Sequence, residues 1–136
     1  MLRLTLKSQS MGEYGMTRLS ALVAQVLHDL DPGGKMYAPT VSYLPGDTES
    51  YLDVLIEDDT GMKCGFSVDA SCSDHEVLYE LADRLPTAFV ELYAVGLPLV
   101  PGTQRPATPE IIENAVIWKD PAGRVDWTCP VGQYTA

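Results

Sequence analysis

The stretch from Tyr51 to Val68, YLDVLIEDDTGMKCGFSV, constrains the fold more than any other part of the chain. Apolar and polar residues alternate on both sides of the turn sequence Asp-Asp-Thr-Gly, which is typical of a β-hairpin with one buried face. A register shift of one residue would turn one of the two apolar sets towards water. The pairing must therefore place both apolar sets on the same face.

A three-residue loop, Asp59-Thr60-Gly61, meets this requirement. It places Gly61 at the left-handed position that such loops need. A two-residue loop also matches the faces but leaves the glycine without a role, and a four-residue loop would separate the apolar sets. The predicted pairs are Ile56–Cys64, Val54–Phe66 and Leu52–Val68 on the core face, with Glu57 opposite Lys63 on the other face.

Length and composition favour a single domain, because 136 residues with 46% hydrophobic content can form one core. The sequence has no apolar run long enough to span a membrane, and its first ten residues lack the apolar segment of a secretory signal. The sequence has an odd number of cysteines, Cys64, Cys72 and Cys129, and they lack the pair spacing of metal sites. We therefore expect a reduced, cytoplasmic protein without a metal or cofactor.

The negative charge is concentrated in one part of the chain. Between Asp47 and Asp83 there are eleven acidic residues and one base, Lys63, whereas the rest of the chain has eight of each. Such a surface repels nucleic acid and anionic lipid and attracts basic partners. Direct nucleic-acid binding is further disfavoured because no basic stripe accompanies the aromatic residues. The alternative is a solvated acidic face that only aids solubility.

The first third of the chain predicts a strand over residues 2–6, a loop over 11–15 and a helix over 17–30. The sequence DPGG then ends the helix. Residues 36–44 follow as a strand, and Pro39 favours an edge position because proline donates no backbone hydrogen bond.

A second helix is predicted to begin at Ser73, since Ser73 and Glu76 have the spacing of a capping box. After Pro86, residues 88–95 suit either a continued, kinked helix or a strand, and the helix is the favoured interpretation. Residues 96–110 contain four prolines and read as an extended connector.

The last part of the chain predicts a hairpin between residues 115–118 and 124–128 around the turn sequence DPAG. Ile117 would face Trp127 on the side that docks on the domain. Trp118 would point to the opposite side and be exposed.

These elements predict an α+β fold. A central three-stranded antiparallel meander would carry two helices on one face and be followed by the C-terminal hairpin. We expect one domain over residues 1–136, with an α+β core at 1–95, the connector at 96–110 and the hairpin and tail at 111–136. Residues 108–110 would begin one helical turn.

No catalytic signature is present, and Cys72 is the one residue with a chemical argument. It precedes a predicted helix N-terminus, where the helix dipole favours a thiolate, and His75 could serve as its base. Asp74 and Glu76 oppose a thiolate at the same place. A small cysteine-dependent hydrolase or redox enzyme is therefore an alternative interpretation.

The segment from Glu80 to Gly132 contains LADRLP, VELYAVGLPLVPG and AVIWKDPAGRVDWTCPVG. It resembles a loosely defined set of small uncharacterised actinobacterial and actinophage proteins with a similar helix, a proline-rich connector and an aromatic tail with Cys-Pro. Those relatives tend to carry Cys and His in the connector, which implies a zinc-ribbon-like tail. Here the connector has neither, so only Cys129 remains and no metal site is expected. The resemblance implies no known function.

The leading hypothesis is a small acidic protein that binds a protein partner with a basic surface. An inhibitor, immunity or anti-defence protein, or a mimic of DNA charge, fits this description. The alternatives are the cysteine enzyme and a phage or structural assembly subunit, and a homo-oligomer remains open. The candidate partner-binding residues are Tyr51, Asp53, Glu57, Asp58, Asp59 and Trp118.

Overall fold

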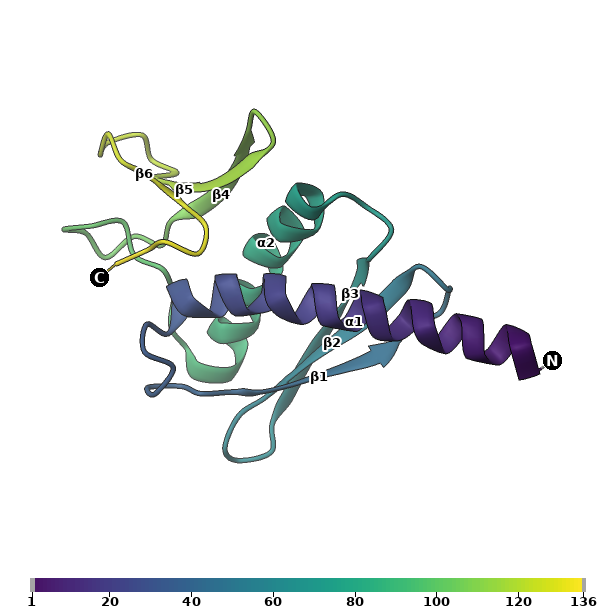
Figure 1. Cartoon of the computed structure of the whole chain (residues 1–136). Helices are drawn as coiled ribbons and strands as arrows, with labels where there is room; N and C mark the ends of the chain where they lie inside the picture. Colours follow the sequence, from purple (N-terminus) through teal and green to yellow (C-terminus); the bar gives the residue numbers. More distant parts are fainter. Residues whose placement is uncertain (1, 136) are drawn as a thin grey trace.

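The computed structural model describes residues 2–135 and contains two helices and two three-stranded antiparallel sheets (Figure 1), which is the expected α+β fold. Neither helix within residues 2–135 combines the length and hydrophobicity needed to cross a lipid bilayer. The elements, in chain order, are α1 (Leu2–Leu30), β1 (Thr40–Pro45), β2 (Tyr51–Glu57), β3 (Lys63–Asp69), α2 (Asp74–Tyr93), β4 (Thr108–Ile112), β5 (Ala115–Lys119) and β6 (Thr128–Pro130).

The first sheet has the order β1-β2-β3, and the predicted meander is confirmed. Its central hairpin also has the predicted register, with Val54 opposite Phe66 and Glu57 opposite Lys63. Gly61 has a φ of 88°, the left-handed conformation that the three-residue loop requires. The demand that both apolar sets share one face, together with the left-handed position needed for Gly61, therefore fixed the pairing.

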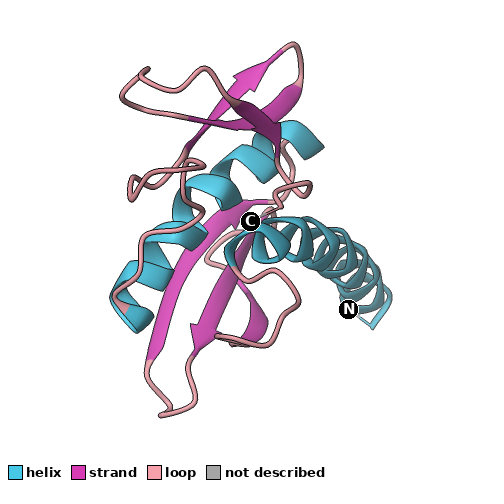
Figure 2. Cartoon of the chain, turned by 90° about the vertical axis from the view of Figure 1, so that its left-hand side faces the viewer, coloured by secondary structure: helices cyan, strands magenta, loops and turns pink. Residues whose placement is uncertain are grey.

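Both helices cover one face of this sheet (Figures 1 and 2). Leu52, Val54 and Ile56 of β2 are almost completely buried and belong to one core cluster with buried residues of α1 and α2. The same cluster includes Val116 and Trp118 of the second sheet. The hydrophobic core is thus continuous across both sheets.

The N-terminal expectations were wrong, because α1 is continuous from Leu2 to Leu30 and includes residues 2–6 and 11–15. Helix propagation adds one backbone hydrogen bond per residue, so a helix already formed over 17–30 extends readily. A strand over 2–6 would need a partner strand, and α1 instead carries this end of the chain beyond the first sheet (Figure 1).

β1 begins later than the expected strand over 36–44 because Asp31 holds its first residues in a turn. The Asp31 carboxylate accepts hydrogen bonds from the N–H groups of Met36, Tyr37 and Ala38 at 3.0–3.1 Å. These N–H groups are therefore not available to the sheet. β1 lies at a sheet edge, as the neighbouring Pro39 predicted.

α2 begins with the predicted capping box. Glu76 accepts hydrogen bonds from the Ser73 N–H at 3.3 Å and the Ser73 hydroxyl at 2.6 Å. The helix continues through Pro86 to Tyr93, so the helical interpretation of the segment after Pro86 is confirmed up to that residue.

The second sheet has the order β4-β5-β6 and differs from the expected hairpin in both partners of β5. Residues 108–110, expected as a helical turn, belong to β4, where Pro109 is tolerated because β4 is an edge strand. The second partner is β6, so Ile117 pairs with Pro130 and not with Trp127.

The Asp120 side chain explains why residues 124–127 stay out of this sheet. Its carboxylate accepts hydrogen bonds from the N–H groups of Ala122, Arg124 and Val125 at 2.9–3.1 Å and pairs with the Arg105 guanidinium at 2.8 Å. Gly123 has the predicted left-handed conformation, with a φ of 67°. The turn was correctly predicted, but the loop around it is wider than a hairpin turn.

The predicted exposure of Trp118 was also wrong. Trp118 is 0% exposed, whereas Trp127, the expected core residue, is only half-buried. The Trp118 indole N–H donates to the carboxylate of Asp29, near the C-terminal end of α1, at 2.7 Å. The face of β5 assigned to solvent is therefore the one that packs against the helices.

Asp29 connects α1 to the C-terminal segment. Its side chain is completely buried and also accepts hydrogen bonds from the N–H groups of Gly132 at 2.6 Å and Tyr134 at 3.0 Å. Together with the indole of Trp118, three donors from distant parts of the sequence converge on one carboxylate. A buried donor that loses its acceptor costs about 1–3 kcal/mol.

We expect Asp29→Ala to lower the free energy of unfolding by about 3 kcal/mol or more, because it leaves these three donors without an acceptor. Urea denaturation followed by tryptophan fluorescence measures the change. Asp126→Ala, at an exposed position, is the control and should change stability by less than about 0.5 kcal/mol. Similar losses in the two variants would contradict the assigned role of Asp29.

The Arg105 guanidinium and the surrounding N–H donors hold the pKa of Asp120 well below its usual range. Because the pKa is lowered on folding from about 3.9, Asp120 contributes stability above about pH 4 that is lost as the pH falls. We expect Asp120→Asn to unfold more easily than the parent at pH 7, with a difference that narrows below about pH 4. Denaturation midpoints of the parent and the variant, measured from pH 7 to below pH 4, test this expectation. A difference in stability that stays constant with pH would refute it.

Candidate functional site

The outer face of β2 carries three of the six residues predicted to contact a partner, whereas Trp118, another of the six, is buried in β5. Tyr51, Asp53 and Glu57 alternate with the buried residues of the strand, and Tyr51 is 40% exposed. The Asp53 carboxylate accepts a hydrogen bond from the Ser67 hydroxyl on β3 at 2.6 Å. We call Tyr51, Asp53, Glu57, Asp58 and Asp59 the acidic sheet face.

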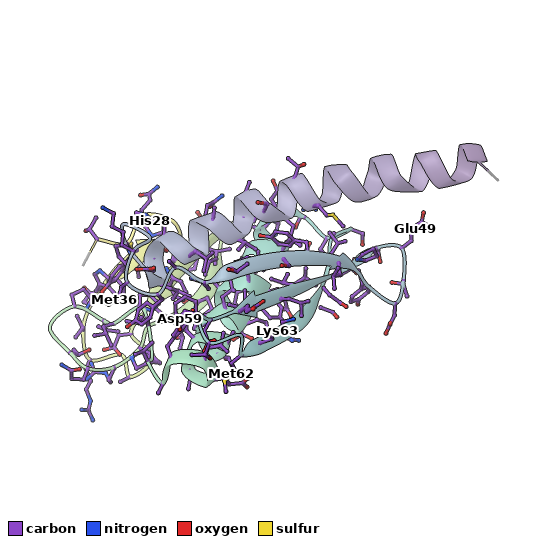
Figure 3. All side chains as sticks on the ribbon, turned by 90° about the horizontal axis from the view of Figure 1, so that it is seen from below. His28, Met36, Glu49, Asp59, Met62 and Lys63 are labelled. Carbon is purple, nitrogen blue, oxygen red and sulfur yellow. The ribbon has the colours of Figure 1, made fainter. Side chains whose placement is uncertain are left out.

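The tip of the β2–β3 hairpin holds the other two acids in a fixed turn. Asp58 accepts hydrogen bonds from the Thr60 hydroxyl at 2.7 Å and from the N–H groups of Thr60 and Met62 at 2.9 Å. The hydroxyl of Thr60 and these N–H groups lower the pKa of Asp58, so it is ionised at neutral pH. Asp59 is exposed beside it, at one end of the first sheet with Met62, while Glu49 lies at the opposite end (Figure 3).

A groove of about 470 Å³ lies between β3, the first half of α2 and β4. Its lining includes three acids, Asp69, Glu76 and Glu80, and two tyrosines, Tyr51 and Tyr79. Sequence reasoning missed this groove because it did not predict β4, which supplies the Ile111 wall. The acids themselves were visible as part of the acidic stretch.

Local hydrogen bonds keep two of the groove acids ionised. The hydroxyl and N–H of Ser71 lower the pKa of Asp69, and the hydroxyl and N–H of Ser73 lower the pKa of Glu76. Glu80 has a different partner, since its carboxylate lies 3.3 Å from the guanidinium of Arg84, one helical turn later. The groove therefore presents negative charge at neutral pH.

Cys72 lines the same groove but lacks the environment of a nucleophile. Burial raises the pKa of its thiol, and the charges of Asp69 and Glu76 raise it further. The ring nitrogens of His75, the proposed base, lie 3.2 and 3.5 Å from the Ser73 hydroxyl. These charges disfavour the thiolate that the helix N-terminus was expected to stabilise.

Cys64 lies on the core face of the hairpin, as expected, but it is only half-buried. Its thiol donates a hydrogen bond to the Glu91 carboxylate at 3.0 Å, and burial together with Glu91 raises the pKa of the thiol to about 11. Within residues 2–135, no group of three or more His, Cys, Asp and Glu side chains is placed to hold a metal ion.

Comparison with known proteins gives no significant match to a family model, a curated protein or a solved structure. Function is therefore inferred from the residues and their geometry.

We expect the Cys72 thiol to react no faster at pH 7 than an ordinary cysteine, because its raised pKa keeps the thiolate fraction below that of an ordinary cysteine. The measurement is the rate of disulfide exchange with Ellman's reagent in a Cys64→Ser/Cys129→Ser variant. The same variant unfolded in urea provides the reference rate. A folded-state rate well above this reference would restore the cysteine-enzyme hypothesis.

Proposed function

We propose that this chain is a small acidic binding protein whose acidic sheet face contacts a basic surface on a protein partner. The observation that carries the proposal is the concentration of eleven acids against one base between Asp47 and Asp83. That segment forms β2, β3 and the first half of α2, so its charge gathers on adjoining elements.

The way these acids are held supports the proposal. Asp53 is bound by a cross-strand hydroxyl, Asp58 by its own turn, and Glu76 by its capping box. Side chains fixed before binding lose less conformational entropy when a partner arrives. The same hydrogen bonds also stabilise the hairpin turn and the start of α2.

Within this proposal, an inhibitor, immunity or anti-defence protein is the favoured class, and a mimic of DNA charge is one form of it. A mimic must place carboxylates over a continuous surface so that they occupy a basic cleft. A cytoplasmic location is part of the same proposal and rests on the three free cysteines, Cys64, Cys72 and Cys129.

An assembly subunit is the second candidate, and the tip of the β4–β5 hairpin favours it. Ile111 and Ile112 are neighbouring large apolar residues there that remain 39% and 46% exposed. Exposed apolar groups of this kind mark contact surfaces when they form part of a larger patch. Concentration-dependent self-association in light scattering, abolished by Ile111→Ser/Ile112→Ser, would favour this candidate.

We expect binding to the partner to weaken by at least about tenfold in the triple variant Asp53→Asn/Glu57→Gln/Asp59→Asn. Asp58 is left unchanged because it holds the turn. The partner is first captured from lysate at low salt and purified. Its affinity is then measured by calorimetry at several salt concentrations, and the triple variant should also show a weaker dependence on salt.

The matched control is Glu110→Gln/Glu113→Gln/Asp126→Asn, which removes the same charge from the second sheet and the loops that connect its strands. It should bind within about twofold of the parent, because these three acids lie outside the acidic sheet face. Affinity that is independent of salt, or equal losses in both triple variants, would count against the acidic sheet face.

A further inference from the structure

We propose that two copies of this chain pair through the free edges of their β3 strands, which joins two three-stranded sheets into one sheet of six strands. β3 is the last strand in the order β1-β2-β3, so one of its edges has no neighbouring strand within residues 2–135. An open edge is a ready template for pairing with another chain. The edge is separate from the acidic sheet face, so the pairing does not rest on the proposed function.

The hydrogen bonds of the central hairpin show which backbone groups of β3 face this edge. The Asp58 N–H donates to the Met62 carbonyl at 3.0 Å, and the Ala70 N–H donates to the Ser50 carbonyl at 2.7 Å. Hydrogen-bonded pairs alternate along an antiparallel ladder, so the even-numbered residues of β3 bond to β2 and the odd-numbered residues point outwards. These outward residues are Lys63, Gly65, Ser67 and Asp69.

The opposite edge of the sheet is protected against such pairing, whereas the β3 edge is not. By the same alternation, Pro45 occupies an outward position of β1, and Pro39 occupies the corresponding position just before the strand. Proline donates no backbone hydrogen bond and commonly guards sheet edges. β3 contains no proline, and Lys63, Gly65 and Ser67 are exposed. The sheet therefore has one guarded edge and one open edge.

An antiparallel pair of β3 strands has one register in which the charges of the two copies complement each other. With a two-fold axis at Phe66, Lys63 of each copy faces Asp69 of the other, and Gly65 faces Ser67. A two-fold interface uses each contact twice, so this register forms two opposite-charge pairs. Moving the axis by one residue to Gly65 would place Lys63 opposite Ser67 and remove both pairs.

The side chains of β3 suit this pairing on both faces of the sheet. On the outer face, Gly65 and Ser67 are small, so they leave room for the second strand. On the inner face, Phe66 is only half-buried and would meet the same ring of the other copy across the axis. Aromatic cross-strand pairs stabilise a sheet, and residues opposite each other without a hydrogen bond lie closest.

The pairing also determines how the two acidic sheet faces are arranged. Successive side chains alternate between faces, so a register that matches Phe66 with Phe66 keeps the outer faces of both copies on the same side. The acidic sheet face of one copy then continues into that of the other. The dimer would therefore present one acidic surface twice as large as that of the single chain.

The first test is the molar mass of the full chain by sedimentation equilibrium. Concentrations from about 10 µM to 1 mM cover weak association, and about 0.15 M salt screens the repulsion between two acidic copies. We expect the mass to rise with concentration from 14.8 kDa towards twice that value. The mass of a single chain over the whole range would overturn the proposal.

The variant Lys63→Glu tests the register, because it replaces both opposite-charge pairs with like-charge pairs. We expect the Kd of the dimer to rise at least about tenfold. Lys35→Glu, in an exposed loop, changes the net charge equally and should leave the Kd within about twofold of the parent. Unchanged dimerisation in Lys63→Glu, or equal weakening in both variants, would overturn the register.

Carbodiimide cross-linking tests the contact directly, since it joins an amine to a carboxylate without a spacer. Lys63 and Asp69 lie at opposite ends of β3, about 20 Å apart at about 3.3 Å per residue. A Lys63–Asp69 link identified by mass spectrometry must therefore join two copies, and we expect it in the cross-linked dimer. A dimer that lacks this link, or one abolished by Ile111→Ser/Ile112→Ser and not by Lys63→Glu, would contradict pairing through β3.

Discussion

The buried carboxylate of Asp29 is the interaction on which the arrangement of the two sheets depends. It joins the end of α1 to the indole of Trp118 in β5 and to the backbone of Gly132 and Tyr134. A carboxylate in an apolar core is costly unless donors surround it, so these contacts specify one docking position for the second sheet. That docking places β4 against α2, and the groove lined by Ile111 exists only because of it.

The first sheet separates its two tasks by strand alternation. One face of β2 supplies Leu52, Val54 and Ile56 to the core, and the other presents Asp53 and Glu57. Because successive side chains point to opposite faces, the acids add charge without disturbing the core. The same segment continues into α2, so the acidic sheet face and the groove lie on neighbouring elements. A partner with several basic groups could contact the acidic sheet face and the groove at once, and the two contacts together would increase its affinity.

Local patterns predicted those parts of the fold that depend on neighbouring residues. The register of the central hairpin, the left-handed Gly61 and the capping box at Ser73 all follow from spacing within a few residues. The predictions failed where a distant group decided the outcome. The Asp120 carboxylate pairs with Arg105 and accepts hydrogen bonds from the N–H groups of its own loop, which keeps that loop out of the sheet. The Asp29 carboxylate accepts a hydrogen bond from Trp118, whose ring strand alternation had assigned to solvent.

The sequence by itself determined the central meander, the second helix and the concentration of negative charge, because alternation, capping and charge are properties of adjacent residues. Only the tertiary structure decided the extent of α1, the pairing of β5 with β4 and β6, and the burial of Trp118. It also decided the formation of the groove, whose lining residues are spread along the sequence between Tyr51 and Ile111. Such features depend on contacts between residues far apart in the chain. No local sequence pattern gives the free energy of these contacts.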